Sequence, residues 1–167
     1  TTRPKRKNEI NKKDYFFVTD KKFVDLTKKN FFVETAKNFN NHYGTPYVQI
    51  KNSLKDNKDI LFDIDWKGAR KLRKYYNKDQ IIDFFILPPN KKELKKRLEK
   101  RGRDNKSEIN IRLSYAMSEI SHYKEYKYVL VNENINETVK NLIAIINYNK
   151  LISNLNNGIS KKLKFIK

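Results

Sequence analysis

The sequence predicts an α/β fold: a parallel β-sheet core covered by helices, with a small mixed or antiparallel lobe before it. From about residue 58, short apolar runs alternate with longer segments whose apolar residues recur at helical spacing. Such alternation implies right-handed β-α-β crossovers and a parallel sheet buried on both faces. Before residue 58 the runs are short and aromatic, which favours a small antiparallel unit.

In the N-terminal third, residues 15–18 and 31–33 are aromatic and β-branched runs that predict two strands. Asp20 is the predicted N-cap of a helix that follows the first of them. Residues 43–46 predict a tight turn, because they combine glycine and proline, and a helix is expected after it.

In the remainder, strands are predicted at residues 60–64, 84–87 and 128–131, with helices between and after them. A helix is expected over about 67–76, and the next begins at Asn90, where Glu93 completes a capping-box spacing. Two more helices are expected, from about Ser107 and through Val139 to Ile146. Beyond Lys150 the chain is rich in lysine and asparagine, so a fraying helix or disorder is expected.

Composition excludes several classes of site and protein. The 167 residues include no cysteine, which excludes disulfides, zinc-thiolate sites and cysteine nucleophiles. No apolar run reaches the roughly 18 residues of a membrane span and no signal peptide is visible, so we expect a cytoplasmic protein without a membrane partner. The chain begins at Thr1 and its single methionine is Met117, so we expect that residues preceding Thr1 were lost.

The net charge of +19 raises nucleic acid as a partner, but the excess is mostly scattered lysine, as in drifted surfaces encoded by AT-rich genomes. We therefore expect no specific nucleic-acid partner. The eight arginines are more informative, because lysine cannot replace the planar fork that grips phosphate oxygens in pairs. Arg70 and Arg73 are interpreted as ordinary surface or capping residues, and the others are candidate phosphate ligands.

Four groups of residues have the types that nucleotide chemistry needs. They are Arg3 and Arg6 with Tyr15; Glu34 with Tyr43, Gly44 and Thr45; Asp63 and Asp65 at the end of a predicted strand; and Arg97, Arg101 and Arg103 with Arg112. The third has the pattern of a Walker B strand, and the fourth places cations on a helix that Gly102 can end.

In order and spacing, these groups resemble the guanylate kinase family from Thr1 to about Ile146, most closely its bacterial members. The resemblance extends to Phe85–Pro89 and to the run from Ser121 through Tyr126 to Asn132. It implies a P-loop nucleoside monophosphate kinase core with a GMP-binding lobe and a helical lid. The implied regions are 1–57 for GMP binding, 58–100 for core, 101–112 for lid, 113–149 for the rest of the core and 150–167 for a basic tail.

The resemblance also implies residue roles in the transfer of the γ-phosphate of ATP to GMP or dGMP, with Mg²⁺ bound to ATP. The GMP phosphate would be bound by Arg3, Arg6, Tyr15 and Tyr43, and guanine by Glu34, Asp65 and Thr45. Asp63 would lie near the magnesium without being a direct metal ligand. Arg97, Arg101 and Arg112 would clamp the ATP phosphates, and Asn132 would lie near adenine.

Two departures from the family pattern are visible. Residues 8–13 contain no glycine where the family usually has it, and the glycine-rich ATP-phosphate loop expected before Thr1 is not in this sequence. We therefore expect this stretch of chain to be inactive by itself.

Two alternatives stay open: a non-catalytic guanylate-kinase-like module that binds proteins, and a nucleic-acid-binding domain. A homo-oligomer is compatible with the sequence.

Overall fold

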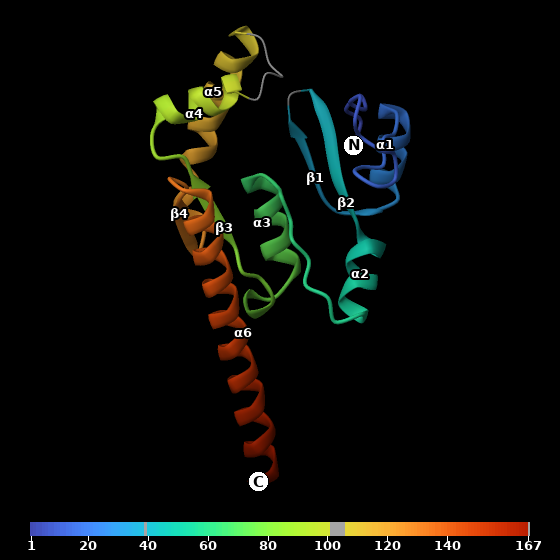
Figure 1. Cartoon of the computed structure of the whole chain (residues 1–167). Coiled ribbons are helices and arrows are strands. Elements are labelled where there is room, and N and C mark those ends of the chain that lie inside the picture. Colours follow the sequence, from blue (N-terminus) through green and yellow to red (C-terminus); the bar gives the residue numbers. More distant parts are fainter. Residues whose placement is uncertain (39, 101–105, 167) are drawn as a thin grey trace. The chain divides into compact units, whose positions relative to one another are not determined.

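The computed structural model describes the backbone of residues 1–38, 40–100 and 106–166, and the side chains of residues 1–38, 40–100 and 107–155 (Figure 1). The chain divides into two compact units, Thr1–Asn77 and Lys78–Lys167. Helices and small sheets occur in both, so the α/β class predicted from the sequence is confirmed.

The first unit is built on an antiparallel pair of strands, β1 (Phe32–Asn38) and β2 (Asn41–Pro46). Glu34 is opposite Thr45 in this register, and Ala36 is opposite Tyr43. Asn40 has φ of 65°, a left-handed conformation that asparagine tolerates better than most residues and that the tight connection requires. The predicted turn at 43–46 is therefore wrong, because pairing with β1 extends this segment into a strand.

Three helices complete this unit: α1 (Asp20–Lys28), α2 (Tyr47–Lys55) and α3 (Trp66–Tyr75). The N-cap of α1 is Thr19 rather than the predicted Asp20, since Thr19 Oγ1 accepts the backbone N–H of Lys22 at 3.2 Å. Phe23 of α1 is buried and stacks on Phe32 of β1, with ring centroids 4.7 Å apart. This contact fixes the helix against the hairpin.

Helix α3 packs against β1, which places its N-terminus beside Glu34. Asp65 caps the helix by accepting the backbone N–H of Gly68 at 2.8 Å. One turn further, Lys71 Nζ donates to the carbonyl of Thr35 in β1 at 2.7 Å. Gly68 eases the close approach, because a Cβ at this position would lie 3.1 Å from Glu34 Oε2, a tight contact.

Two predicted strands of this unit are not formed. Residues 15–18 make hydrogen bonds to separate partners instead of a ladder: Phe17 N–H donates to Asn11 Oδ1 and Val18 N–H to the carbonyl of Thr1. Residues 60–64 are outside any strand, and Leu61 is 94% exposed. An apolar run becomes a strand only when a neighbour pairs with it, and no described strand pairs with either segment.

The second unit contains the parallel pair β3 (Phe84–Leu87) and β4 (Tyr128–Val131), in register along their length. Helices α4 (Lys91–Lys100) and α5 (Lys106–Ile120) lie between them in the chain and pack through Leu98, Ile109 and Leu113. The predicted cap of α4 is confirmed, since Asn90 Oδ1 accepts the backbone N–H of Glu93 at 2.8 Å. Short 3₁₀ turns occupy Lys78–Gln80 and Tyr123–Glu125.

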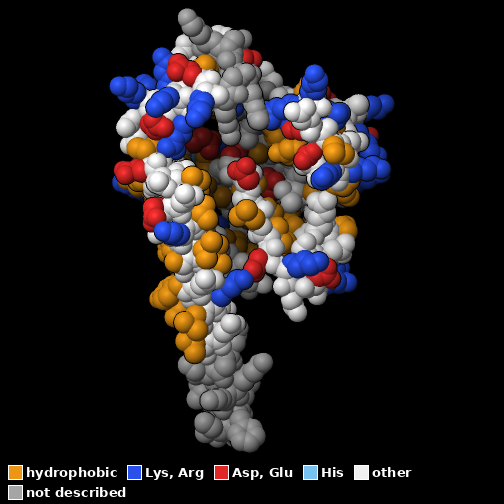
Figure 2. Space-filling model, in the orientation of Figure 1, with side chains coloured by type: hydrophobic (Ala, Val, Ile, Leu, Met, Phe, Trp, Pro, Cys, Tyr) orange, Lys and Arg blue, Asp and Glu red, His pale blue; other side chains and the backbone are white. Residues whose placement is uncertain are grey.

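Helix α6 spans Ile135–Ile166, so the helix predicted through Ile146 continues into the basic tail. Exposed apolar side chains, including those of Ile143, Leu151 and Leu155, line part of its surface (Figure 2). Among the helices of the described residues, none is long and apolar enough to cross a membrane.

Candidate functional site

A cavity of about 280 Å³ opens in the first unit, between the hairpin and the segment that leads into α3. Five of the predicted ligands lie on its wall, and three of them are acidic. Its lining consists of Tyr15, Glu34, Ala36, Asn38, Tyr43, Asp63, Ile64 and Asp65. The hairpin and the N-terminus of α3 therefore bring together residues that are far apart in the sequence.

Glu34 is the most buried carboxylate of this cavity, with 4% of its surface exposed. Its Oε1 accepts a hydrogen bond from Thr45 Oγ1 at 2.7 Å, as their opposed positions in β1 and β2 allow. Burial raises the pKa of Glu34, the Thr45 hydrogen bond opposes this rise, and the negative charge of Asp65 adds to it. Glu34 is thus a desolvated acceptor, and the charge of nearby Lys71 opposes the rise of its pKa only in part.

Asp65 is held in place from two sides. Its Oδ1 accepts the backbone N–H of Gly68, and with the amide of Asn38 oriented to suit its neighbours, Asn38 donates to Oδ2 at 3.3 Å. Each carboxylate oxygen can accept more than one hydrogen bond. Asp65 can therefore accept further donors from a ligand without losing the bonds that orient it.

Arg3 lies at the side of the cavity formed by the two tyrosines. Its guanidinium carbon is 5.4 Å from the ring centroid of Tyr15 and 5.6 Å from that of Phe17, distances at which the ring faces attract a cation. The rings of Tyr15 and Tyr43 are 6.4 Å apart, and Tyr43 contributes to the raised pKa of Arg3, whose main cause is Glu9. The predicted phosphate ligands Arg3, Tyr15 and Tyr43 are thus neighbours.

Glu9 joins Arg3 to Arg6. Its Oε1 lies 2.6 Å from Arg3 Nη2 and 3.8 Å from Arg6 Nη1, and its Oε2 accepts the backbone N–H of Arg6 at 2.8 Å. These hydrogen bonds, first that of Arg3, lower the pKa of Glu9 to about 2. Arg6 reaches the group through Glu9, and its own side chain is exposed.

The segment that carries Arg3 is attached to β2. Thr2 N–H donates to the carbonyl of His42, and His42 N–H donates to Thr2 Oγ1, both at 2.9 Å. Because His42 precedes Tyr43, this exchange fixes Arg3 and Tyr43 in the same part of the unit.

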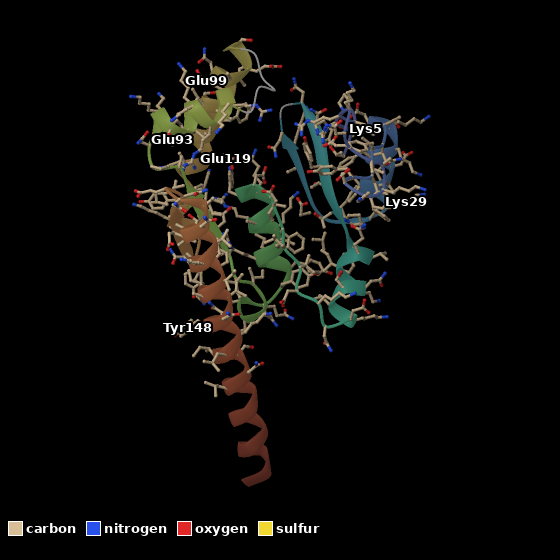
Figure 3. All side chains as sticks on the ribbon, viewed as in Figure 1. Lys5, Lys29, Glu93, Glu99, Glu119 and Tyr148 are labelled. Atoms are coloured by element: carbon tan, nitrogen blue, oxygen red, sulfur yellow. The ribbon has the colours of Figure 1, made fainter. Side chains whose placement is uncertain are left out.

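Of the residues predicted to bind ATP, those described belong to the second unit. Arg97 of α4 pairs through Nε with Glu93, labelled in Figure 3, at 3.0 Å, and donates through Nη2 to the carbonyl of Asn132 at 2.9 Å. The side chain of Asn132 accepts from Thr138 Oγ1 at 3.3 Å. Arg112 lies on α5, and Arg101 is outside the described residues.

No group of three or more acidic or histidine side chains that could hold a metal occurs in the described part of the chain. Asp63, on the cavity wall, is a single exposed carboxylate. One carboxylate fits a Mg²⁺ ion that nucleotide phosphates and water mainly coordinate, rather than a metal bound by the protein alone.

Comparison with known proteins identifies the family. The family model described as guanylate kinase matches residues 1–149. The chain belongs to the guanylate kinase family. Members of the guanylate kinase family are nucleoside monophosphate kinases that transfer phosphate from ATP to GMP.

Individual members of the guanylate kinase family are similar over most of the chain. A guanylate kinase of Blochmanniella pennsylvanica is 46% identical over 87% of this chain and 68% of its own length. One of Rickettsia prowazekii is 43% identical over 87% of this chain and 73% of its own length. The crystal structure of guanylate kinase from Anaplasma phagocytophilum superposes with a TM-score of 0.74 at 34% identity, covering 88% of this chain and 71% of that one.

Sequence reasoning missed Glu9, Asn38 and Ala36. Glu9 lies in the segment 8–13, which was noted only for its lack of glycine, although an acid three residues after Arg6 in a basic stretch is a signal of an ion pair. Asn38 and Ala36 gave no such signal, because they line the cavity only through the alternation of β1, which also brings Glu34 to it.

Proposed function

We propose that this protein is a guanylate kinase, which transfers the γ-phosphate of ATP to GMP or dGMP, and that the cavity of the first unit is its GMP site. One observation carries the proposal: the two acids that can read guanine, buried Glu34 and half-buried Asp65, share a cavity wall with Tyr15 and Tyr43, and the Arg3 guanidinium lies over the Tyr15 ring. A base-reading end and a phosphate-binding end are thus joined in a single site.

Guanine suits the acidic end of the cavity. Its N1–H and exocyclic amino group are donors, and Glu34 and Asp65 are acceptors with unused capacity. Adenine has no donors at the matching edge, so it would leave both carboxylates without these partners, at a cost of about 1–3 kcal/mol for the buried Glu34. The site would therefore select GMP over AMP.

Thr45 would take part by changing partner. A hydroxyl has a single proton, and in the present structure Thr45 donates it to Glu34. To donate to guanine O6, as the family resemblance implies, the hydroxyl would rotate away from Glu34 while the base donors replace it there. Base binding and reorientation of Thr45 would then occur together.

The remaining predicted ligands would act on ATP and its metal ion. We propose that Arg97, Arg101 and Arg112 neutralise charge on the transferring phosphate, that Asn132 lies near adenine, and that Asp63 lies near the Mg²⁺ that accompanies ATP. In phosphoryl transfer the protein contributes mainly position and charge neutralisation, so no side chain has to be a nucleophile. The metal would supply neutralisation of the ATP phosphates.

Binding of GMP tests the site directly. Trp66 is the only tryptophan and directly follows Asp65, so its fluorescence is a reporter of base binding. Titration with GMP should be saturable, and AMP should bind at least tenfold more weakly. A tenfold difference in affinity corresponds to about 1.4 kcal/mol, which lies within the cost expected for the unpaired carboxylate. Equal affinities for GMP and AMP would contradict the assignment of the cavity to guanine.

The alternative of a non-catalytic module is not favoured. The relatives compared above are named guanylate kinase at 43–46% identity, and the chain retains Arg3, Arg6, Glu34 and Asp65 together.

A further inference from the structure

Glu9 is the acidic residue that lies among the proposed ligands of the GMP phosphate. Three interactions within a few residues hold its carboxylate there: the ion pair with Arg3, the hydrogen bond from the backbone of Arg6, and the longer ion pair with the Arg6 side chain. The neighbouring Lys5, labelled in Figure 3, donates through Nζ to the backbone carbonyl of Glu9 at 3.0 Å. The first three contacts tie Arg3 and Arg6 to the Glu9 carboxylate, and the fourth ties Lys5 to the backbone of Glu9.

The Arg3 guanidinium is fixed on one edge by these contacts. Nη2 donates to Glu9 at 2.6 Å, and Nη1 donates to the carbonyl of Pro4 at 2.8 Å. A guanidinium has five N–H donors in a rigid plane, so bonds along one edge fix the direction of those that remain. The guanidinium carbon lies over the rings of Tyr15 and Phe17, which further limits its position.

We propose that Glu9 is a positioning residue for the nucleotide phosphate: it orients Arg3 and holds the backbone at Arg6, so that the unused donors of the two guanidinium groups converge on the phosphate. The inference rests on the GMP site proposed above and names a member that the sequence did not indicate. Glu9 itself makes no contact with the phosphate, since two anions would repel each other.

Two effects of Glu9 on GMP oppose each other. Its negative charge lowers the attraction of the site for a phosphate dianion, whereas its hydrogen bonds hold Arg3 in one orientation before the ligand arrives. The charge of Glu9 is offset by Arg3 and Arg6 beside it, and salt weakens what repulsion remains, while the orienting bonds are short and direct. Orientation should therefore outweigh repulsion, and removal of the carboxylate should weaken GMP binding.

The test compares three proteins and two ligands. Glu9→Gln removes the charge and keeps the size, and Glu9→Asp keeps the charge but is one methylene shorter, so it cannot reach Arg3 and Arg6 N–H together. Asp14→Asn is the matched control: Asp14 lies in the same segment, accepts Ile10 N–H at 2.6 Å, and loses the same charge without touching either arginine. Affinities for GMP and for guanosine, which lacks the phosphate, are measured by calorimetry or Trp66 fluorescence.

We expect both Glu9 variants to bind GMP about tenfold more weakly than the unmodified chain, as for one lost charge-assisted hydrogen bond, and guanosine within about twofold of it. Asp14→Asn should match the unmodified chain for both ligands. If Glu9→Gln binds GMP as tightly as Asp14→Asn, or more tightly, Glu9 does not position the site.

Other failures are distinguishable from that one. If the unmodified chain binds neither GMP nor guanosine, the proposed GMP site itself is wrong. If Glu9→Gln loses guanosine as well as GMP, its role is to maintain the fold rather than to orient donors, and the inference is wrong. Unchanged GMP binding by Glu9→Asp would also overturn it, because that variant keeps the charge and loses only the reach.

Discussion

Replacement of Glu34 by glutamine should separate stability from ligand binding. The carboxylate is 4% exposed, and burial raises its pKa above the ordinary value. Ionised Glu34 is therefore disfavoured in the folded chain relative to the unfolded one. Glutamine has nearly the same shape, can accept the hydrogen bond from the Thr45 hydroxyl, and never carries the charge.

The sign of the pH effect follows from proton binding. A carboxyl with a raised pKa in the folded state binds more protons there than in the unfolded state, so stability falls as pH rises between the two pKa values. The contribution of Glu34 is fully present below its ordinary pKa and is lost as pH rises through the folded pKa. Glu34→Gln lacks this loss, so at pH 7 the variant should be at least as stable as the unmodified chain.

GMP binding should change in the opposite direction. An amide at position 34 can replace the carboxylate only in part, because its NH₂ group would face the base donors. A buried side chain that loses its hydrogen bond to the base costs about 1–3 kcal/mol, which corresponds to a roughly 5- to 150-fold loss in affinity. The loss should be seen with guanosine too, since it concerns the base and not the phosphate.

The assay is chemical denaturation of both proteins at several pH values from 4 to 7.5, with GMP titrations at pH 7.5. The free energy of unfolding of the unmodified chain, relative to Glu34→Gln, should be highest at the acidic end and decline towards neutral pH. Two results would refute this reasoning. One is that the stability of Glu34→Gln relative to the unmodified chain falls, rather than rises, between pH 4 and pH 7. The other is that Glu34→Gln binds GMP with unchanged affinity.

Four further changes have defined outcomes. Arg3→Lys keeps the charge but loses the fork, so GMP affinity should fall about tenfold by titration, with guanosine little affected. Thr45→Val removes the hydrogen bond to Glu34, which should lower the free energy of unfolding by about 1 kcal/mol in denaturant. Gly68→Ala gains about 1 kcal/mol of helix propensity, but the added Cβ would lie 3.1 Å from Glu34 Oε2 and displace that carboxylate. Affinity for GMP should therefore fall while stability changes little. Because the pKa of Glu9 is lowered to about 2, its stabilisation is present above the ordinary value and lost as pH falls through about 2, and Glu9→Gln should reduce this acid sensitivity.

Each of these predictions has a matched comparison. Thr45→Ser keeps the hydroxyl and should preserve stability better than Thr45→Val, and an equal loss in both would assign the effect to packing. Lys74→Ala, an exposed change on the same helix as Gly68, should leave GMP affinity unchanged. Asp14→Asn should keep the acid sensitivity that Glu9→Gln reduces. Unchanged GMP affinity in Arg3→Lys would show that the phosphate lies elsewhere.

Helices were predictable where local signals agree with tertiary packing. Asn90 caps α4 as expected, and the spacing of Ile109 and Leu113 produced the buried face of α5. Strands were less predictable, because their formation depends on a partner that can be distant in the sequence. The run at 60–64 has the composition of a strand but pairs with none of the described strands, and residues 43–46 have the composition of a turn but pair with β1.

By itself, the sequence determined the chemical types at the proposed site. Forked cations at Arg3 and Arg6, hydroxyls at Tyr15 and Tyr43, and acids at Glu34 and Asp65 are visible without a structure, because side-chain chemistry is local. Only the tertiary structure decided which of them meet. Strand pairing set Thr45 opposite Glu34, the cap of α3 set the orientation of Asp65, and an ion pair placed Glu9 between the arginines. Burial and charge shift a pKa only once side chains are packed together, so these properties cannot be read from a single segment of the chain.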